Sequence, residues 1–229
     1  MSNPFIINNH FIKFNNYMNK IFLILAAAMI MSNYCKAQDG NTDQREVPHF
    51  GVRIGANFSN VYDTKGDNFK ADNKIGFVFG GFLSVPVSKY IGIQPEVLYS
   101  QKGYKTSGSV LGLNYDYTHT SYYLDIPILL AFKPIPVLSI QIGPQYSYLM
   151  KQKNEFNSSL LSGQNESDYD NSNVRKNTLC LLGGVELNIN HFIVSARAGW
   201  DLQNNNGDGT STFPRYKNVW YQTTIGILF

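Results

Sequence analysis

Hydrophobic and polar residues alternate with a period of two along most of the chain from residue 49 onward. In the first such segment, Val52, Ile54 and Phe58 alternate with small or polar residues such as Arg53 and Asn57. This spacing is typical of a β-strand with one apolar face, and no helical period of 3.6 residues competes with it. Eight segments follow the pattern, and they are 49–59, 74–87, 90–105, 115–132, 137–150, 177–189, 192–202 and 218–229.

The lengths of the segments and of their connections indicate a particular β architecture. Each segment has about ten residues or more, which lets a tilted strand cross a bilayer. The connections alternate long and short, as in outer-membrane barrels with long external loops and short periplasmic turns. The long connections are 62–73, 106–114, 151–176 and 203–217, and the short ones are 88–89, 133–136 and 190–191. We therefore expect an all-β, eight-stranded antiparallel up-and-down transmembrane β-barrel with both termini in the periplasm.

A soluble alternative has the same alternation but buries its apolar face. A secreted eight-stranded sandwich or a lipocalin-like barrel would satisfy the period of two. Aromatic residues near the segment ends instead favour interfacial girdles, and they are Phe58, Tyr99, Tyr148, Trp200, Trp220 and Tyr221. Pro95, Pro127 and Pro144 fall inside the segments, and because proline lacks a ladder donor we expect local bulges there.

The first 37 residues differ from the rest. Lys20 precedes an apolar run of 11 residues, 21–31, which is too short to span a bilayer and is typical of a signal peptide. We expect cleavage between Ala37 and Gln38, with Met18 as an alternative start; lipidation at Cys35 is disfavoured because small residues do not precede it. The expected organisation is a signal peptide at 1–37, a short periplasmic lead at 38–48 and a barrel at 49–229.

Composition and charge exclude several classes of protein. Only 15% of the 229 residues are charged, against roughly 25% in an ordinary soluble domain. Residues 1–37 hold three of the 19 basic residues and no acid, so 16 basic and 16 acidic residues remain and nothing favours a nucleic-acid partner. After cleavage Cys180 is the only cysteine, and the scattered histidines have no metal-ligand spacing. We expect no cofactor and no metal.

Four motifs resemble a known family. The segments 51–59 (GVRIGANFS), 92–103 (GIQPEVLYSQKG), 123–128 (YLDIPI) and 143–146 (GPQY) are similar to the PorT-like outer-membrane β-barrel family of Bacteroidota. The resemblance covers residues 49–229. It implies a protein of the outer membrane, and because the family's namesake assists protein secretion, it makes a secretion-system or envelope protein a candidate partner.

Charged residues on the inward phase of the strands form the main candidate site. An eight-stranded barrel is just wide enough to be filled by side chains, so we expect a packed, salt-bridged interior and no diffusion pore. A small gated ion channel is the alternative. The inward charges are Arg53, Glu96, Asp125, Glu186, Arg197 and Asp201, and we expect Glu96, Glu186 and Asp201 to lie nearest the arginines.

A second candidate chemistry lies at His119 and Ser121. The pair resembles the His-x-Ser motif of lipid A deacylases, in which histidine activates serine for acyl transfer, but Lys133 replaces the expected acid. We therefore expect no enzyme, with a lipid-modifying acyl hydrolase as the alternative. The expected role is structural or interactive, through external loops, and accessory to secretion as one option.

The last strand resembles the signal read by the barrel-assembly machinery. It alternates apolar residues and ends in an aromatic residue at the C-terminus. The expected partners are therefore this machinery and the lipids of the outer membrane. The residues of the expected signal are Tyr221, Ile225, Ile227 and Phe229.

Overall fold

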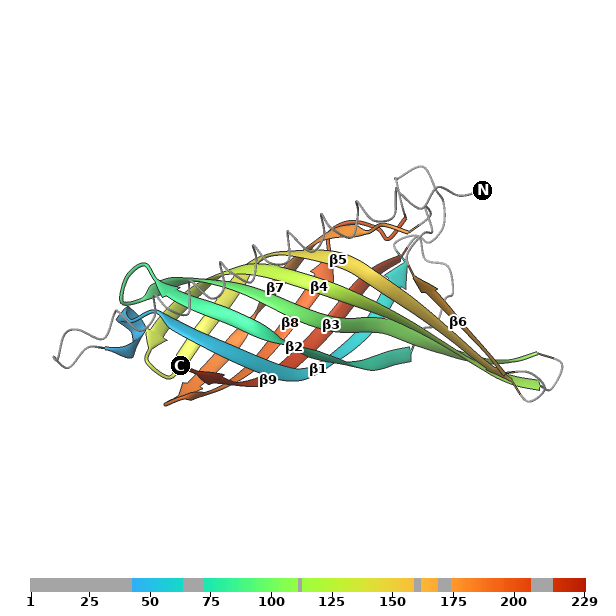
Figure 1. Cartoon of the computed structure of the whole chain (residues 1–229), viewed down its shortest axis with the longest axis horizontal. Coiled ribbons are helices and arrows are strands. Elements are labelled where there is room, and N and C mark those ends of the chain that lie inside the picture. Colours follow the sequence, from blue (N-terminus) through green and yellow to red (C-terminus); the bar gives the residue numbers. More distant parts are fainter. Residues whose placement is uncertain (1–42, 64–71, 111–112, 159–161, 169–173, 207–215) are drawn as a thin grey trace, which may run out of the picture. The chain divides into compact units, whose positions relative to one another are not determined.

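The computed structural model describes residues 43–63, 72–110, 113–158, 162–168, 174–206 and 216–229. One short 3-10 helix, η1 (Gln44–Glu46), precedes the strands (Figure 1). The strands are β1 (His49–Asp63), β2 (Asp72–Pro86), β3 (Ile91–Val110), β4 (Leu113–Ile135), β5 (Leu138–Ser158), β6 (Ser162–Asp168), β7 (Asn177–Ile189), β8 (Phe192–Asp201) and β9 (Tyr216–Leu228). No helix among these residues is long and apolar enough to cross a membrane.

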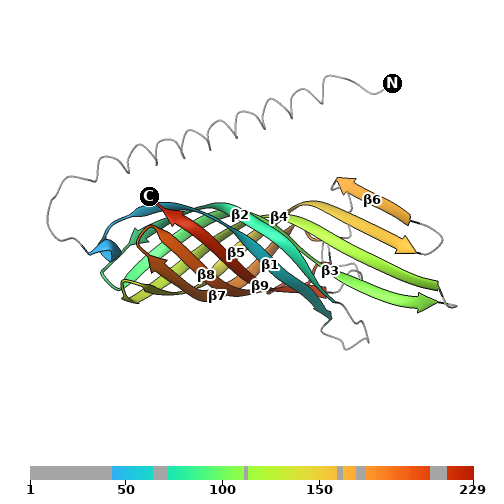
Figure 2. The same ribbon diagram turned by 90° about the horizontal axis from the view of Figure 1, so that it is seen from below.

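Eight of the strands close into a ring. The order is β4-β3-β2-β1-β9-β8-β7-β5, and pairing of β4 with β5 completes the circle (Figure 2). Every strand pair is antiparallel, including the seam between β1 and β9. The prediction of an eight-stranded antiparallel barrel is confirmed. The ninth strand, β6, pairs only with β5 in the described sheet and lies outside the ring.

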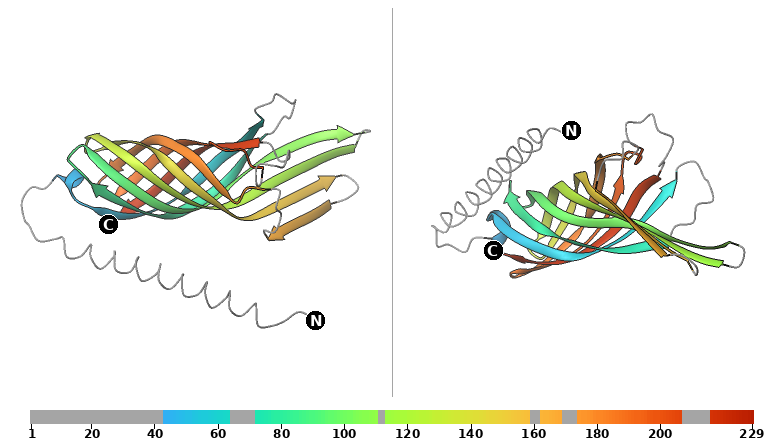
Figure 3. Two further views of the ribbon diagram at one scale, coloured as in Figure 1. Left: turned by 90° about the horizontal axis from the view of Figure 1, so that it is seen from above. Right: turned by 45° about the vertical axis from the view of Figure 1, so that its right-hand side comes forward.

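Two of the connections expected to be loops are largely β-hairpins. β3 and β4 stay paired to Val110 and Leu113, so most of 106–114 is strand. In the 151–176 connection, β5 continues to Ser158 and pairs with β6. Main-chain pairing needs no apolar face, so the sequence carries no alternation where both faces of the hairpin are polar. The two hairpins project beyond one end of the ring (Figure 3).

The prolines do not produce the bulges expected of them. Ladder pairs are missing next to Pro95, Pro127 and Pro144, but the pairing resumes on both sides in the same register. The register shifts lie elsewhere, between Asn73 and Val78, between Tyr122 and Tyr123, and between Phe132 and Ile135. The strands therefore tolerate the missing backbone N–H of each proline without an inserted residue.

The barrel is apolar outside and polar inside. Ile54 is 59% exposed and Phe229 is 68% exposed, whereas Arg53, Asn57 and Gln145 are buried. A soluble barrel would bury its apolar face. An apolar outer surface instead suits a lipid environment, and it excludes the lipocalin-like alternative. One girdle residue was assigned wrongly: Trp220 is fully buried and points into the barrel.

The two ends of the barrel differ, and we name them by their connections. At the turn end lie the short turns that join β2 to β3, β4 to β5 and β7 to β8; Asn190 takes a left-handed φ of 57° in the last of them. The C-terminus is also there, since Phe229 N–H donates to Phe50 O at 2.7 Å. At the opposite, hairpin end, β3–β4 and β5–β6 project. The expected signal peptide and its cleavage at Ala37 and Gln38 lie outside the described residues.

Candidate functional site

Two arginines and two glutamates form a closed ion-pair cluster across the lumen. We call Arg53, Glu96, Glu186 and Arg197 the arginine–glutamate cluster; they come from β1, β3, β7 and β8, and all are buried. Arg197 binds Glu96 in a bidentate fashion, with Nη1 to Oε2 at 2.8 Å and Nη2 to Oε1 at 2.9 Å. Arg53 Nη2 is 2.9 Å from Glu186 Oε2 and 3.4 Å from Glu96 Oε1.

Neutral side chains complete this layer. Arg197 Nη2 donates to Gln141 Oε1 at 2.7 Å, and Gln94 Nε2 donates to Glu96 Oε1 at 2.9 Å. The Arg53 guanidinium lies over the Phe82 ring at 4.2 Å, a cation–π contact. The charges balance within the cluster, so this level of the lumen is filled by groups that neutralise one another.

A second layer contains a cation that the sequence analysis missed. Lys102 is 1% exposed; its Nζ is 2.9 Å from Asp125 Oδ2 and 3.8 Å from the Trp220 ring. Ser147 Oγ donates to Asp125 at 2.5 Å. The signal was available, because Lys102 continues the inward phase of Gln94 and Glu96.

Asp201 lies away from the arginines, contrary to expectation. Its Oδ2 accepts from Asn218 Nδ2 at 2.6 Å, and its Oδ1 accepts from the buried Cys180 thiol at 3.1 Å. Both partners lie near Asp201 on β7 and β9, whereas Arg197 is four residues back along β8 and pairs at another level. With Lys102, Lys74 and Lys133 counted, the buried cations of the strands are as numerous as the four buried acids or more, so the excess of acid that the six expected charges implied is absent.

The His-x-Ser pair forms part of a third polar layer, toward the hairpin end. His119 Nε2 is 3.0 Å from Ser121 Oγ, and His119 Nδ1 is 2.6 Å from Asn154 Oδ1. Lys133 is remote from it and donates to Ser84 Oγ near the turn end. Asn154 takes the place of the expected acid, and only the pairing of β4 with β5 reveals it. Ser121 is 3% exposed, so its hydroxyl faces the packed interior.

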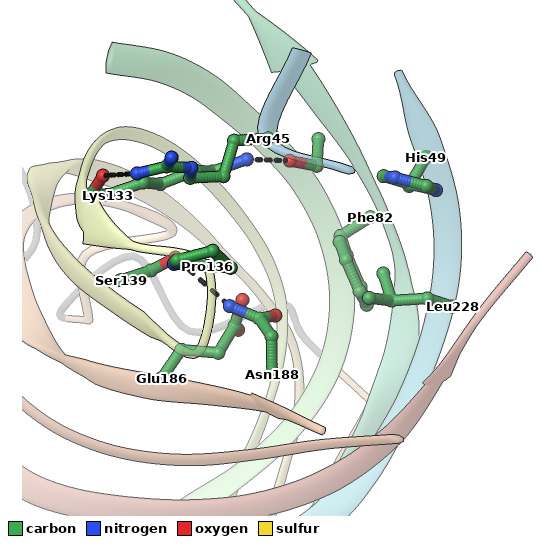
Figure 4. Close-up of a pocket in the computed structure, with 10 residues that line it drawn as sticks. Arg45, His49, Phe82, Lys133, Pro136, Ser139, Glu186, Asn188 and Leu228 are labelled. Atoms are coloured by element: carbon green, nitrogen blue, oxygen red, sulfur yellow. Dashed lines mark hydrogen bonds between the residues drawn. The ribbon is translucent and has the colours of Figure 1, made fainter. Parts of the chain in front are cut away.

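A small cavity lies at the turn end, beneath Arg45 of η1 (Figure 4). Its volume is about 30 Å³, which leaves room for little more than water. Arg45 Nη1 donates to Lys133 O at 3.4 Å and to Pro134 O at 3.3 Å. The same guanidinium binds Asp43 at 2.5 Å, and these hydrogen bonds lower the pKa of the Asp43 carboxyl from its ordinary value. The lead before β1 therefore clamps the turn end.

The remaining candidate residues lie on the outer face. Phe229 stacks against Phe50 with ring centroids 6.2 Å apart, beside the seam of β1 and β9. The other expected assembly-signal residues point outward on β9, and they are Tyr221, Ile225 and Ile227. Within the described part of the chain, no group of three or more histidine, cysteine or acidic residues is placed to hold a metal ion.

Comparison with known proteins identifies a family and several similar folds. A family model described as outer membrane protein beta-barrel domain matches residues 37–206. The attachment invasion locus protein Ail of Yersinia pestis is 15% identical with a TM-score of 0.45, covering 79% of this chain and 98% of that chain. Neisserial surface protein A is 13% identical with a TM-score of 0.47, covering 79% and 97%. Acinetobacter baumannii CarO2 is 12% identical with a TM-score of 0.41, covering 79% and 99%. No curated protein sequence matches the chain significantly.

Proposed function

Because the chain belongs to the outer membrane protein beta-barrel domain family, we propose that it is a non-enzymatic outer-membrane protein with a filled interior. In this proposal the barrel is a rigid stalk, and the β3–β4 and β5–β6 hairpins present an interaction surface outside the cell. The observation that carries the proposal is the arginine–glutamate cluster, whose charges neutralise one another in the lumen.

The orientation follows from the unequal ends. Outer-membrane barrels have short turns on the periplasmic side and long connections outside. We therefore assign the turn end to the periplasm. This also places η1, which precedes the first strand, and Phe229, which follows the last, in the periplasm. The Arg45 clamp would then face the periplasm and the hairpins the medium. The PorT-like motifs favour a secretion-system or envelope protein as the partner of the hairpins.

Labelling of intact cells tests this orientation. Ser107→Cys places a thiol on an exposed residue of the β3–β4 hairpin, and Lys89→Cys places one in a short turn. Native Cys180 is fully buried and gives a low background. A membrane-impermeant maleimide should label the hairpin thiol and spare the turn thiol until the cells are lysed. Labelling of the turn thiol alone would place the hairpins in the periplasm and overturn an external interaction surface.

An acyl hydrolase is the second candidate, favoured by the hydrogen bonds that link Ser121, His119 and Asn154. The chain has a nucleophile, a base and a group that orients the base. Burial of Ser121 weighs against it, because an acyl chain must reach the hydroxyl. Mass analysis of lipid A from cells with the wild-type protein and with Ser121→Ala distinguishes the two. The non-enzymatic proposal expects identical spectra, and loss of a deacylated species in the variant would establish the hydrolase.

A further inference from the structure

A bulge in β5 decides which residues of the β5–β6 hairpin continue the inner face of the barrel. The ladder pairs Leu149 and then Lys151 with consecutive residues of β4, so Met150 is an extra residue. Beyond the bulge Gln152 points inward, since its Nε2 donates to Ser121 Oγ at 3.3 Å. Even-numbered residues of β5 therefore take the lumen side from there on, whereas Lys151 faces outward.

The lumen-side face of the two projecting hairpins carries a row of aromatic rings (Figure 3). The ladder places Tyr117 of β4 beside Phe156 of β5, with Tyr115 one row further out. The rings of Tyr115 and Phe156 stack with centroids 6.2 Å apart. Tyr104 of β3 begins the row at the mouth of the barrel, 6.3 Å from the Tyr117 ring. We call these four residues the aromatic strip.

Neighbouring side chains hold the lower part of the strip in place. Tyr117 OH donates to Asn154 Oδ1 at 2.9 Å. Tyr104 stacks on His119, with ring centroids 5.2 Å apart, and His119 Nδ1 is itself 2.6 Å from Asn154 Oδ1. The rings are therefore positioned before any ligand arrives, which lowers the entropic cost of binding.

Two glycines shape the space around the outer part of the strip. At Gly108 a Cβ would lie 2.5 Å from the phenol oxygen of Tyr115, so the missing side chain lets this ring lie over the sheet. Gly163 is the ladder partner of Phe156, and no described atom lies within 4 Å of the place its Cβ would take. The space beside the Phe156 ring is therefore open, and this side chain is 41% exposed.

The charged side chains of the hairpins lie on the opposite face, where acids and lysines match. Asp116 separates the two strip residues of β4, and Lys153 Nζ lies 2.6 Å from Glu155 Oε1. The lumen-side rows instead contain neutral hydrogen-bonding groups, such as those of Thr106 and Asn154. No acid, lysine or arginine is among the described side chains of the strip rows, so a charged ligand would find no ion-pair partner there.

The strip lies beyond the level at which hydrocarbon ends. Phe79, Tyr99 and Tyr122 pack in series on the outer face of β2, β3 and β4, and such aromatic girdles mark the change from hydrocarbon to headgroups. Tyr117 is five residues further along β4 than Tyr122, a path of roughly 17 Å at about 3.4 Å per residue. The exposed rings therefore meet the aqueous medium, where an apolar surface marks a binding site for something other than lipid.

We infer that the aromatic strip binds a neutral saccharide chain. The C–H groups on the face of a pyranose ring carry a small positive charge, and they are attracted to the negative face of an aromatic ring. The sugar hydroxyls need donors and acceptors, which Thr106, Asn154 and the phenol groups supply along the strip. The uncharged rows disfavour a sulfated or phosphorylated sugar. The inference rests on the proposed function, since it names the class of partner that the external hairpins bind.

Saturation-transfer NMR on the purified protein in a sugar-free detergent tests the site without reference to orientation. The probes are maltoheptaose, a tetramer of N-acetylglucosamine, a heparin tetrasaccharide, and an uncharged peptide of alternating serine and alanine. At least one neutral sugar should bind, with the strongest saturation at its ring C–H protons. The heparin fragment and the peptide should not bind.

A pair of double variants locates the binding. Tyr115→Ser combined with Phe156→Ser removes two exposed rings and should weaken binding of the neutral sugar roughly tenfold, the effect of two aromatic contacts. Asp116→Ala combined with Asn157→Ala is the matched control, because these ladder partners are exposed on the opposite face of the same strands. It should bind as wild type does, and heat-modifiable gel mobility establishes that each variant is folded.

Several results would overturn the inference. Failure of both neutral sugars to bind would reject it, and binding of the peptide in their place would make the strip a peptide platform. Tighter binding of the heparin fragment would show that charge is recognised. Unchanged binding without the two rings, or equal weakening in the control, would place the sugar elsewhere. If the sugar binds as expected but labelling of cells places the hairpins in the periplasm, the site stands and the proposed function fails.

Discussion

At the scale of single residues, the interior charges are held by specific geometry. Arg197 is completely enclosed and makes three short contacts, two to Glu96 and one to Gln141. Removing one partner of a buried ion pair leaves an uncompensated charge where water cannot reach it. Gly199 leaves room for the Trp220 ring that covers Lys102. A Cβ at this position would lie only 2.3 Å from that ring.

Arg197→Ala should therefore destabilise the barrel by roughly 3–5 kcal/mol, because Glu96 and Glu186 lose a shared cation. Urea unfolding in lipid vesicles, followed by tryptophan fluorescence, measures the change in the free energy of unfolding. Arg175→Ala, a cation outside the ring, is the control and should change it little. An Arg197→Ala barrel as stable as wild type would contradict the paired interior.

At the scale of elements, alternation identified the barrel strands because their two faces meet opposite surroundings. It located all six expected charges inside, although Lys102 was overlooked and Asp201 was given the wrong partners. It failed at the hairpins, where both faces are polar and the period carries no information. It failed again at Met150, because one inserted residue reverses the phase of everything beyond it; neither Asn154 beside His119 nor the outward Lys151 follows from the sequence.

The η1 lead should remain clamped in mild acid. The Arg45 guanidinium lowers the pKa of Asp43 below its ordinary 3.8, so the carboxylate stays charged until the pH falls through that lower value. The contribution of the Arg45–Asp43 ion pair to the stability of the folded lead is complete above pH 3.8. It is lost only in stronger acid, as the carboxylate is protonated. An NMR titration of the Asp43 carboxyl should show this shift in the wild type and an ordinary pKa in Arg45→Gln. The same titration curve for both proteins would exclude the ion pair between Arg45 and Asp43.

The last strand should govern assembly. Phe229 is exposed at the end of β9, stacked beside Phe50 at the seam that closes the ring. Deleting Phe229 should lower the fraction of folded protein in the outer membrane, read as heat-modifiable gel mobility. Deletion removes little buried surface, so refolding in vitro should be nearly unaffected. Undiminished insertion in cells would show that β9 carries no assembly signal at its terminal aromatic residue.

At the scale of the whole molecule, polar layers are stacked along the lumen. The arginine–glutamate cluster lies nearer the turn end, the Lys102 layer follows, and His119 with Ser121 and Asn154 lies toward the hairpin end. Neutral side chains also bond to one another in the lumen. Gln222 donates to Asn57 Oδ1 at 3.0 Å, and Asn57 donates to Ser100 Oγ at 2.8 Å. A barrel of eight strands has just the space that such side chains fill. The stacked layers therefore close the interior of the barrel.

Single-channel recording in planar bilayers measures whether the interior is closed to ions. Purified wild-type protein, inserted and verified as folded, should give no regular conductance steps at either polarity, because the arginine–glutamate cluster fills the lumen at its level. A denatured and refolded sample with the same gel mobility serves as the control for contaminating porins. Reproducible conductance steps that disappear in Arg197→Ala while the barrel stays folded would contradict a closed interior and identify a channel lined by these charges.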